Sequence, residues 1–430
     1  MKQKSLGRSA ALNGLRTAVD LLFPIITFPY ISRVLAVDNV GAYNFAGAVI
    51  SYFLMLAGLG ITTYAIREGS KLREDRKALD RFASEVFTIN LVSTAASYLL
   101  LWACVACFPA LQGHQALLAM FSIQIFFTTL GTEWLYAVFE EFAYITVRSI
   151  AFKILSLVLL FILVRSEGDL MAYAGITVFA HVGSNVLNFF HARRFCTIRP
   201  VLGVPWRRHM GPIMVIFSSS VAISIYTCSD STLLGLLRSE HEVGVYAVSA
   251  QIYALAKTML SAVLIVAVPR LSLYLGSGST EDYRRTLARV SEGVATLLLP
   301  TVLMLFFLAE EFILTLSDAS FMEATGSLRL LAAALVFCLT GWIANDCVLI
   351  PARREKVVLV STLVSASLNI ALDFILIPRI GVDAVGWSTL AAEGSVMLIS
   401  IIKSADVAGL DRSMAVDLAK TAAASLSVPA

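Results

Sequence analysis

Charged residues are scarce in this 430-residue chain: Asp, Glu, Lys and Arg together make up 15% of it. Soluble domains carry about 25% charged residues, so the deficit argues against an ordinary soluble protein, and the mean hydropathy of +0.80 supports a membrane protein. The basic residues are dispersed along the chain instead of gathered in one patch, and the net charge is only +3. We therefore expect no nucleic-acid partner.

Signatures of catalysis are also missing. The chain has no GxxxxGK[ST] phosphate-binding loop, no HExxH zinc motif and no GxSxG nucleophile motif. Of its five histidines only His181 falls well inside an apolar run. We expect no enzymatic activity, no cofactor and no metal site, and the missing phosphate-binding loop argues against self-contained ATP-driven transport.

Apolar runs fill most of the sequence. Twelve stretches approach the ~20 residues that a helix needs to cross a bilayer, and the connections between them are too short to hold a folded domain. The chain is predicted to be an all-α polytopic membrane protein with spans at 12–35, 41–64, 83–108, 115–139, 142–165, 170–192, 211–237, 243–268, 286–310, 326–351, 357–378 and 384–403.

Basic residues fall on alternate connections between these spans. The N-terminus and every second connection, with their flanking helix turns, hold 27 of the 33 Lys and Arg. The positive-inside rule places such loops in the cytoplasm. We therefore expect a cytoplasmic N-terminus, and basic loops that rest on anionic membrane lipids.

A weak internal repeat divides the chain. VGAYNFAGAVISY, from Val40, resembles VGVYAVSAQIYAL, from Val243, and six predicted spans separate the two copies. An even number gives both halves the same orientation, as in transporters whose halves are related by an axis along the membrane normal. The prediction is a six-helix lobe at 1–192, a basic cytoplasmic linker at 193–210, a second six-helix lobe at 211–403 and a central cavity between the lobes.

The C-terminal tail, 404–430, ends in ten small, mostly apolar residues after Lys420. This segment is expected to be either a loose cytoplasmic tail or the start of a thirteenth span that the sequence does not complete.

The first span combines polar residues with two prolines. Asn13, Arg16 and Asp20 share one helical face. Arg16 is either a binding residue for an anionic substrate or a partner of Asp20 that reaches the membrane surface. Pro24 and Pro29 remove backbone hydrogen bonds, which makes this span a candidate hinge, although a static kink is an equal alternative.

Two lysines lie inside predicted spans, where a central charge costs about 2.5–3.5 kcal/mol and usually faces the protein interior or a water-filled cavity. Lys153 lies in the fifth span, and Lys257 shares a face of the eighth with Tyr246 and Tyr253. These lysines are candidates to bind an anion, and the tyrosines to stack on sugars. A structural ion pair between Lys257 and Asp230 is the alternative.

Buried carboxylates supply candidates for ion coupling, because they can carry protons or sodium during transport. In the eleventh span, Ser361, Ser365, Asn369 and Asp373 follow one another at four-residue spacing. Such stripes also hold helices together without binding any ligand. The candidates are the carboxylates Asp20, Glu133, Asp230, Asp373 and Glu393, together with Asn369 of this stripe.

Several segments resemble the bacterial oligosaccharide flippases, or polysaccharide transporters, of the superfamily that includes the multidrug and toxin extrusion carriers. They are FPYISRVLAVDNVGAYNFA (28–46), GLGITTYAIREGSK (58–71), GTEWLYAVFEEFAYITVRSI (131–150), SDSTLLGLL with VGVYAVSAQIY (229–253), VPRLS (268–272) and NDCVLIPARREKVVLVSTLVSASLNIALDFILIP (345–378). The resemblance runs through nearly the whole chain.

This resemblance implies the transfer of an oligosaccharide linked to undecaprenyl pyrophosphate across the bacterial inner membrane, for synthesis of O-antigen, capsule or a similar glycan. The partners it implies are the lipid-linked oligosaccharide, membrane lipids, and glycan polymerase and chain-length proteins. Members of the family usually have fourteen spans, two more than are found here. One alternative is a cation-coupled multidrug extruder of the same superfamily. Another is a membrane glycan polymerase or ligase, although this chain lacks the large external loop expected of such an enzyme.

Overall fold

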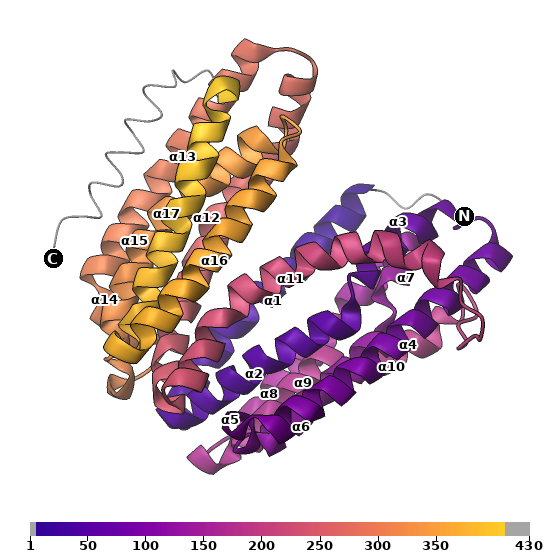
Figure 1. Cartoon of the computed structure of the whole chain (residues 1–430), viewed down its shortest axis with the longest axis horizontal. Coiled ribbons are helices and arrows are strands. Elements are labelled where there is room, and N and C mark those ends of the chain that lie inside the picture. Colours follow the sequence, from indigo (N-terminus) through magenta and orange to yellow (C-terminus); the bar gives the residue numbers. More distant parts are fainter. Residues whose placement is uncertain (1–5, 409–430) are drawn as a thin grey trace. The chain divides into compact units, whose positions relative to one another are not determined.

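The structure, a computed structural model, describes residues 6–408, and for residues 6–13, 16 and 408 it describes the backbone alone. The secondary structure of this part of the chain is helical throughout (Figure 1). Twelve of its helical segments are long and apolar enough to cross a membrane. The predicted all-α fold with twelve spans is therefore confirmed, and most predicted boundaries lie within a few residues of the observed ones. The predicted tail beyond residue 408 lies outside the described residues.

Two compact units divide the chain, Met1–Leu236 and Leu237–Ala430. The segment 211–236, which we assigned to the C-terminal lobe, is grouped with the first unit by its packing. The six-helix lobes at 1–192 and 211–403, with a central cavity between them, stay a prediction. Each unit is described by itself below.

The first unit contains eleven α-helices and one 3₁₀ turn within its described residues. They are α1 (Leu6–Val34), α2 (Val37–Gly58), α3 (Ile61–Lys71), α4 (Arg76–Cys107), α5 (Pro109–Gln112), α6 (Gln115–Gly131), α7 (Glu133–Val138), α8 (Phe142–Leu163), η1 (Glu167–Asp169), α9 (Leu170–Val182), α10 (Asn185–Ala192) and α11 (Trp206–Leu237).

Three spans of this unit are broken helices. The second span is interrupted between α2 and α3, the fourth between α6 and α7, and the sixth between α9 and α10. At the first two breaks the backbone enters the left-handed region, with φ of 45° at Leu59, 68° at Gly60 and 41° at Thr132. Only glycine adopts this region without strain, so Thr132, which is β-branched, is held in an unfavourable conformation.

Side chains from neighbouring helices satisfy backbone carbonyls at two of these breaks. The carbonyl of Ala57, at the end of α2, accepts hydrogen bonds from Asn90 Nδ2 at 2.8 Å and Ser93 Oγ at 2.6 Å, both on α4. The carbonyl of Phe127, near the end of α6, accepts one from Asn185 Nδ2 on α10 at 3.0 Å. The bonds to Ala57 replace the helical bond that the break after Gly58 removes, because a bilayer offers no water to do so. The bond to Phe127, which lies one turn inside α6, ties α10 to α6.

Asn185 can approach α6 because the residue it faces is glycine. A Cβ built on Gly131 would lie 2.8 Å from Asn185 Cγ. Any larger residue at 131 would therefore push the amide away from the carbonyl that it caps.

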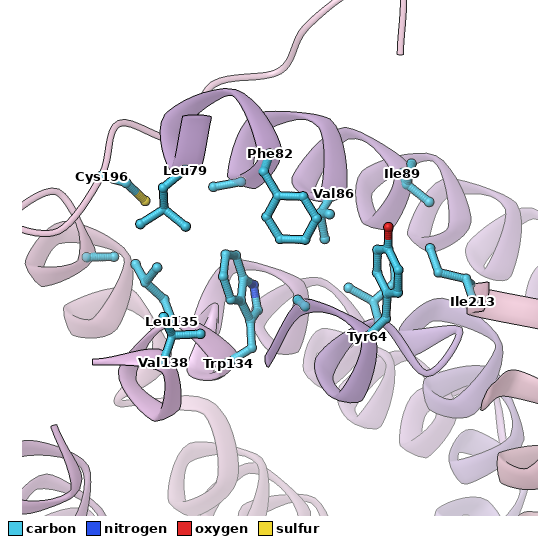
Figure 2. Close-up of a cluster of buried hydrophobic side chains, with 14 of the residues drawn as sticks. Tyr64, Leu79, Phe82, Val86, Ile89, Trp134, Leu135, Val138, Cys196 and Ile213 are labelled. Atoms are coloured by element: carbon cyan, nitrogen blue, oxygen red, sulfur yellow. The ribbon is translucent and has the colours of Figure 1, made fainter. Parts of the chain in front are cut away.

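A buried apolar cluster joins α3, α4 and α7 at one end of this unit (Figure 2). Leu79, Phe82 and Val86 of α4 point across to Tyr64 and Trp134 in that view, and the rings of Phe82 and Trp134 meet edge to face at 6.1 Å. The predicted linker contributes Cys196 and Val204 to the same cluster, and α11 contributes Ile213.

Backbone amides of the segment 193–205 donate hydrogen bonds to side chains of α4, and these bonds hold the segment along that helix. The amide of Thr197 donates to Asp80 Oδ1 at 2.7 Å, and that of Val201 to Thr88 Oγ1 at 2.9 Å. At the start of α11, His209 is fully buried, with its ring nitrogens 2.8 Å from the Tyr64 hydroxyl and 3.1 Å from a Glu85 oxygen. The segment is thus a folded part of the first unit.

The second unit is built from longer, mostly unbroken helices that lie along one another as a bundle (Figure 1). They are α12 (Glu240–Gly276), α13 (Thr280–Phe307), α14 (Ala309–Leu316), η2 (Ala319–Phe321), α15 (Ala324–Trp342), η3 (Ile343–Leu349), α16 (Glu355–Ile380) and α17 (Asp383–Ala408). The tenth span continues from α15 into η3, which is a π-helical turn. Such turns are rare and are frequent at functional sites.

The hydrogen bonds to the Ala57 carbonyl predict a non-additive effect on stability. Asn90→Leu or Ser93→Ala alone should lower the free energy of unfolding only slightly, because the other donor remains. The double variant leaves this carbonyl without a side-chain donor and should cost about 1–3 kcal/mol. Thermal unfolding of the purified variants measures this, and a double variant no less stable than the sum of the single ones would contradict the assignment.

Candidate functional site

The most enclosed charge pair in the second unit joins α12 to α17. Lys257 Nζ lies 3.3 Å from Oε1 of Glu393, whose side chain is 4% exposed. The Tyr253 hydroxyl, one turn earlier on α12, donates to the same oxygen at 3.2 Å. The structure places Glu393 beside Lys257, and the alternative pair of Lys257 with Asp230, which belongs to the first unit, stays a prediction.

Aromatic rings complete the surroundings of this lysine. Its ammonium lies 4.9 Å from the ring centre of Trp342 and 5.4 Å from that of Tyr253, within the range of cation–π attraction. Trp342 is the last residue of α15, directly before the π-helical turn. Tyr246 lies two turns before Tyr253 on α12 and is buried.

A comparable arrangement occurs in the first unit. Lys153 on α8 forms an ion pair with Asp20 on α1, and its ammonium lies 5.7 Å from the ring centre of Phe23. The structure thus brings together two of the predicted residues, Lys153 and Asp20. Arg16 was the predicted partner of Asp20, but its side chain lies outside the described residues. Asp20 is the more accessible of the pair, with 44% of its side chain exposed.

Glu133, at the first position of α7, pairs with a residue that the sequence analysis did not select. Oε1 of Glu133 lies 3.2 Å from a guanidinium nitrogen of Arg148 on α8. Arg148 is buried, and it lies 5.8 Å from the ring centre of Tyr144, which stacks on His191 at 4.1 Å. This pairing compensates the charge of Glu133.

The polar ladder of α16 faces α17. Asn369 Nδ2 lies 3.2 Å from Ser388 Oγ, which donates to Asp373 Oδ1 at 2.5 Å. Ser365 donates to the carbonyl of Ala392 at 3.0 Å. Asn369 and Asp373 are almost completely buried. These contacts show that the ladder holds two helices together, and its role in ion coupling stays a prediction.

The remaining candidates lie on α11 and α1. Asp230 is half-buried on α11 and acts electrostatically on the Tyr52 hydroxyl of α2. Pro24 and Pro29 lie inside α1, which continues through both as one helix from Leu6 to Val34. Bending of α1 at these prolines during a transport cycle stays a prediction.

Arg148 and Trp342 could not be selected from the sequence, for different reasons. Arg148 lies near the start of a span, where an arginine usually reaches the membrane surface, so nothing in the sequence distinguished it. Trp342 lies in a long apolar run, and only the packing of α15 against α12 brings it to Lys257.

Residues 6–275 match the family described as "Polysaccharide biosynthesis protein". The chain belongs to this family.

A relative from Escherichia coli (strain K12), described as "Putative O-antigen transporter", is 22% identical over 274 residues. That match covers 62% of this chain and 65% of the relative, so the two align over about two thirds of the relative's length.

The fold of this family member is shared with solved transporters. An inward closed structure of the lipid II flippase MurJ has a TM-score of 0.72 at 14% identity, over 96% of this chain and 90% of that one. An inward-facing multidrug resistance transporter of the MATE family has a TM-score of 0.66 at 12% identity, over 94% and 99%. These comparisons show that the chain shares its fold with those two proteins.

The pair of Lys257 and Glu393 predicts a charge-dependent pattern of stability. Lys257→Met should cost about 3–5 kcal/mol, since it leaves a buried carboxylate without its ammonium partner. The exchanged variant, Lys257→Glu with Glu393→Lys, keeps both charges and should recover most of that loss. Thermal unfolding in detergent tests this, and equal stability of Lys257→Met and wild type would show that the pair contributes nothing.

Proposed function

We propose that this protein moves a lipid-linked oligosaccharide, carried on undecaprenyl pyrophosphate, across the bacterial inner membrane for the synthesis of O-antigen or a similar polysaccharide. The family match over residues 6–275 carries the proposal. The likeness to an O-antigen transporter and the fold shared with a lipid II flippase support it. The proposed topology has a cytoplasmic N-terminus and two six-helix lobes around a central cavity.

The charge pairs within the spans support an anionic substrate. Lys153 lies beside one carboxylate and one aromatic ring, and Lys257 beside one carboxylate and two aromatic rings. A pyrophosphate offers more negative charge than a single carboxylate, so it competes for either ammonium. The lysine exchanges its protein partner for the substrate, and an aromatic ring is left beside the sugar.

The same exchange provides ion coupling. When the substrate takes the ammonium, Asp20 or Glu393 loses its compensating charge in a low-dielectric environment and gains affinity for a proton or a sodium ion. Release of the substrate restores the pair and expels the ion. The free energy of the ion gradient thereby drives the change between states of alternating access.

Extrusion of cationic drugs is the second candidate function, favoured by the fold shared with a MATE transporter. A cationic drug would use the carboxylates Asp20 and Glu393 directly and would not need the lysines. The variants below distinguish the two functions.

Transport in membrane vesicles tests the proposal. Wild-type protein should move an undecaprenyl-pyrophosphate-linked oligosaccharide across the vesicle membrane, and Lys257→Glu should abolish this transfer while the protein inserts at normal abundance. Lys356→Glu, which reverses an exposed lysine at the start of α16, is the matched control and should transport normally. Ethidium efflux by the wild type and by Lys257→Glu, without any oligosaccharide transfer, would assign drug extrusion instead.

Removal of the Asp20 carboxylate should uncouple transport from the ion gradient. In Asp20→Asn the gradient should accelerate transfer less than in wild type, because the amide takes up no proton at neutral pH. Asp230→Asn is the parallel test on α11. The rate with and without an imposed proton or sodium gradient measures coupling, and unchanged gradient dependence in both variants would exclude these carboxylates from it.

A further inference from the structure

A cavity of about 400 Å³ lies inside the first unit, where its three broken spans meet. Its wall includes Ile61 and Thr62 at the start of α3, Thr132 between α6 and α7, and Val182 and Asn185 on either side of the break between α9 and α10. Its volume lies within the range of small-molecule sites, about 300–1,000 Å³. A single water or ion needs only about 10–15 Å³ of such space.

Two buried oxygens on this wall lack a hydrogen-bond partner. Thr132 Oγ1 and Asn185 Oδ1 belong to residues that are 5% exposed, and neither atom has a partner within the protein. Both residues line the cavity. Buried polar atoms in native proteins are nearly always paired, so these two indicate a missing partner. Neither atom is accessible in this structure, so each side chain must rotate to meet a ligand in the cavity.

The wall is rich in neutral hydrogen-bonding groups, and its titratable residues are Glu133 and His181. Amides and hydroxyls dominate its polar part, contributed by Asn90, Gln124, Thr128 and Thr129 besides the two residues above. Its carboxylate, Glu133, is compensated by Arg148 at 3.2 Å. No lysine or arginine is among the residues that line the cavity.

These features discriminate between classes of ligand. A pyrophosphate requires uncompensated positive charge, and a metal cation requires uncompensated negative charge, whereas the charged pair here balances itself. A sugar ring carries several hydroxyls, each able to donate and accept, as the amides and hydroxyls of the wall also can. Trp134 and Phe87 add apolar surface for the faces of such a ring.

We infer that the cavity of the first unit is a binding site for one uncharged, hexose-sized sugar residue, with Thr132, Gln124 and Asn185 among its hydrogen-bonding partners. That this sugar belongs to the transported oligosaccharide rests on the proposed function. The binding itself does not, because a free sugar presents the same hydroxyls.

The strained backbone at Thr132 agrees with this role. A glycine would adopt the observed φ of 41° without strain, yet it would supply no hydroxyl to the cavity. Strain of this kind persists where the surrounding structure holds it, commonly at ligand sites.

Saturation-transfer NMR on the purified full-length chain in lipid nanodiscs tests the inference, with free hexoses, deoxyhexoses and N-acetylhexosamines as probes. At least one sugar should receive saturation from wild-type protein. Thr132→Val and Gln124→Leu should each weaken its binding about fivefold, since each removes one or two neutral hydrogen bonds. The matched controls are Thr296→Val, at an exposed hydroxyl on α13, and Gln112→Leu, at the exposed last residue of α5; neither should change binding.

Three results would overturn the inference. The first is that no sugar receives saturation, and the second is equal binding by the cavity variants and the controls. The third is stabilisation of the wild type by sodium ions that Thr132→Val removes, which would assign a cation to the cavity. Sugar binding without transfer of lipid-linked oligosaccharide would contradict the proposed function and leave the cavity assignment standing. Transfer without sugar binding would contradict the cavity assignment and leave the proposed function standing.

Discussion

The lack of water in the bilayer core is the constraint on which this structure depends, because every backbone amide and carbonyl at that depth must find a partner within the protein. Continuous helices meet it without help, and most spans of the second unit are of this kind. The first unit interrupts three spans and meets the constraint with side chains, notably Asn90, Ser93 and Asn185. What these polar residues make possible is a polar cavity in a part of the chain that would otherwise be filled by apolar side chains.

The same constraint governs the charges. Lys257 lies opposite Glu393, Lys153 opposite Asp20 and Arg148 opposite Glu133. Pairing makes each charge tolerable within a span, but it also holds the charge in a low dielectric, where a change of partner has a large effect. A transporter of anions can use pairs of this kind as switches, because the substrate and the protein carboxylate compete for one ammonium. The ladder of Asn369 and Asp373 differs, since its contacts are already made with α17.

Much of this fold follows from the sequence, and the reason is physical. The hydrophobic length of a span and the placement of basic residues depend on composition over about twenty residues, so the twelve spans could be predicted closely. The breaks could not, because a threonine in the left-handed region at 132 leaves no mark in hydropathy. The sequence also did not reveal which charged residues pair across spans. Lys257 and Glu393 were both selected as buried charges, but Asp230 fitted the sequence as well as Glu393 did. The contact of Lys153 with Asp20 likewise depends on how α1 packs against α8.

The caps at the broken spans also bear on how the chain enters the membrane. Spans emerge from the ribosome in order, and the carbonyl of Ala57 in the second span has its side-chain donors in the third. Asn185 of the sixth span also donates to the carbonyl of Phe127 in the fourth. Until the third span arrives, the second carries a backbone carbonyl at its break without these donors. The order in which the spans are made therefore sets when this break gains its cap.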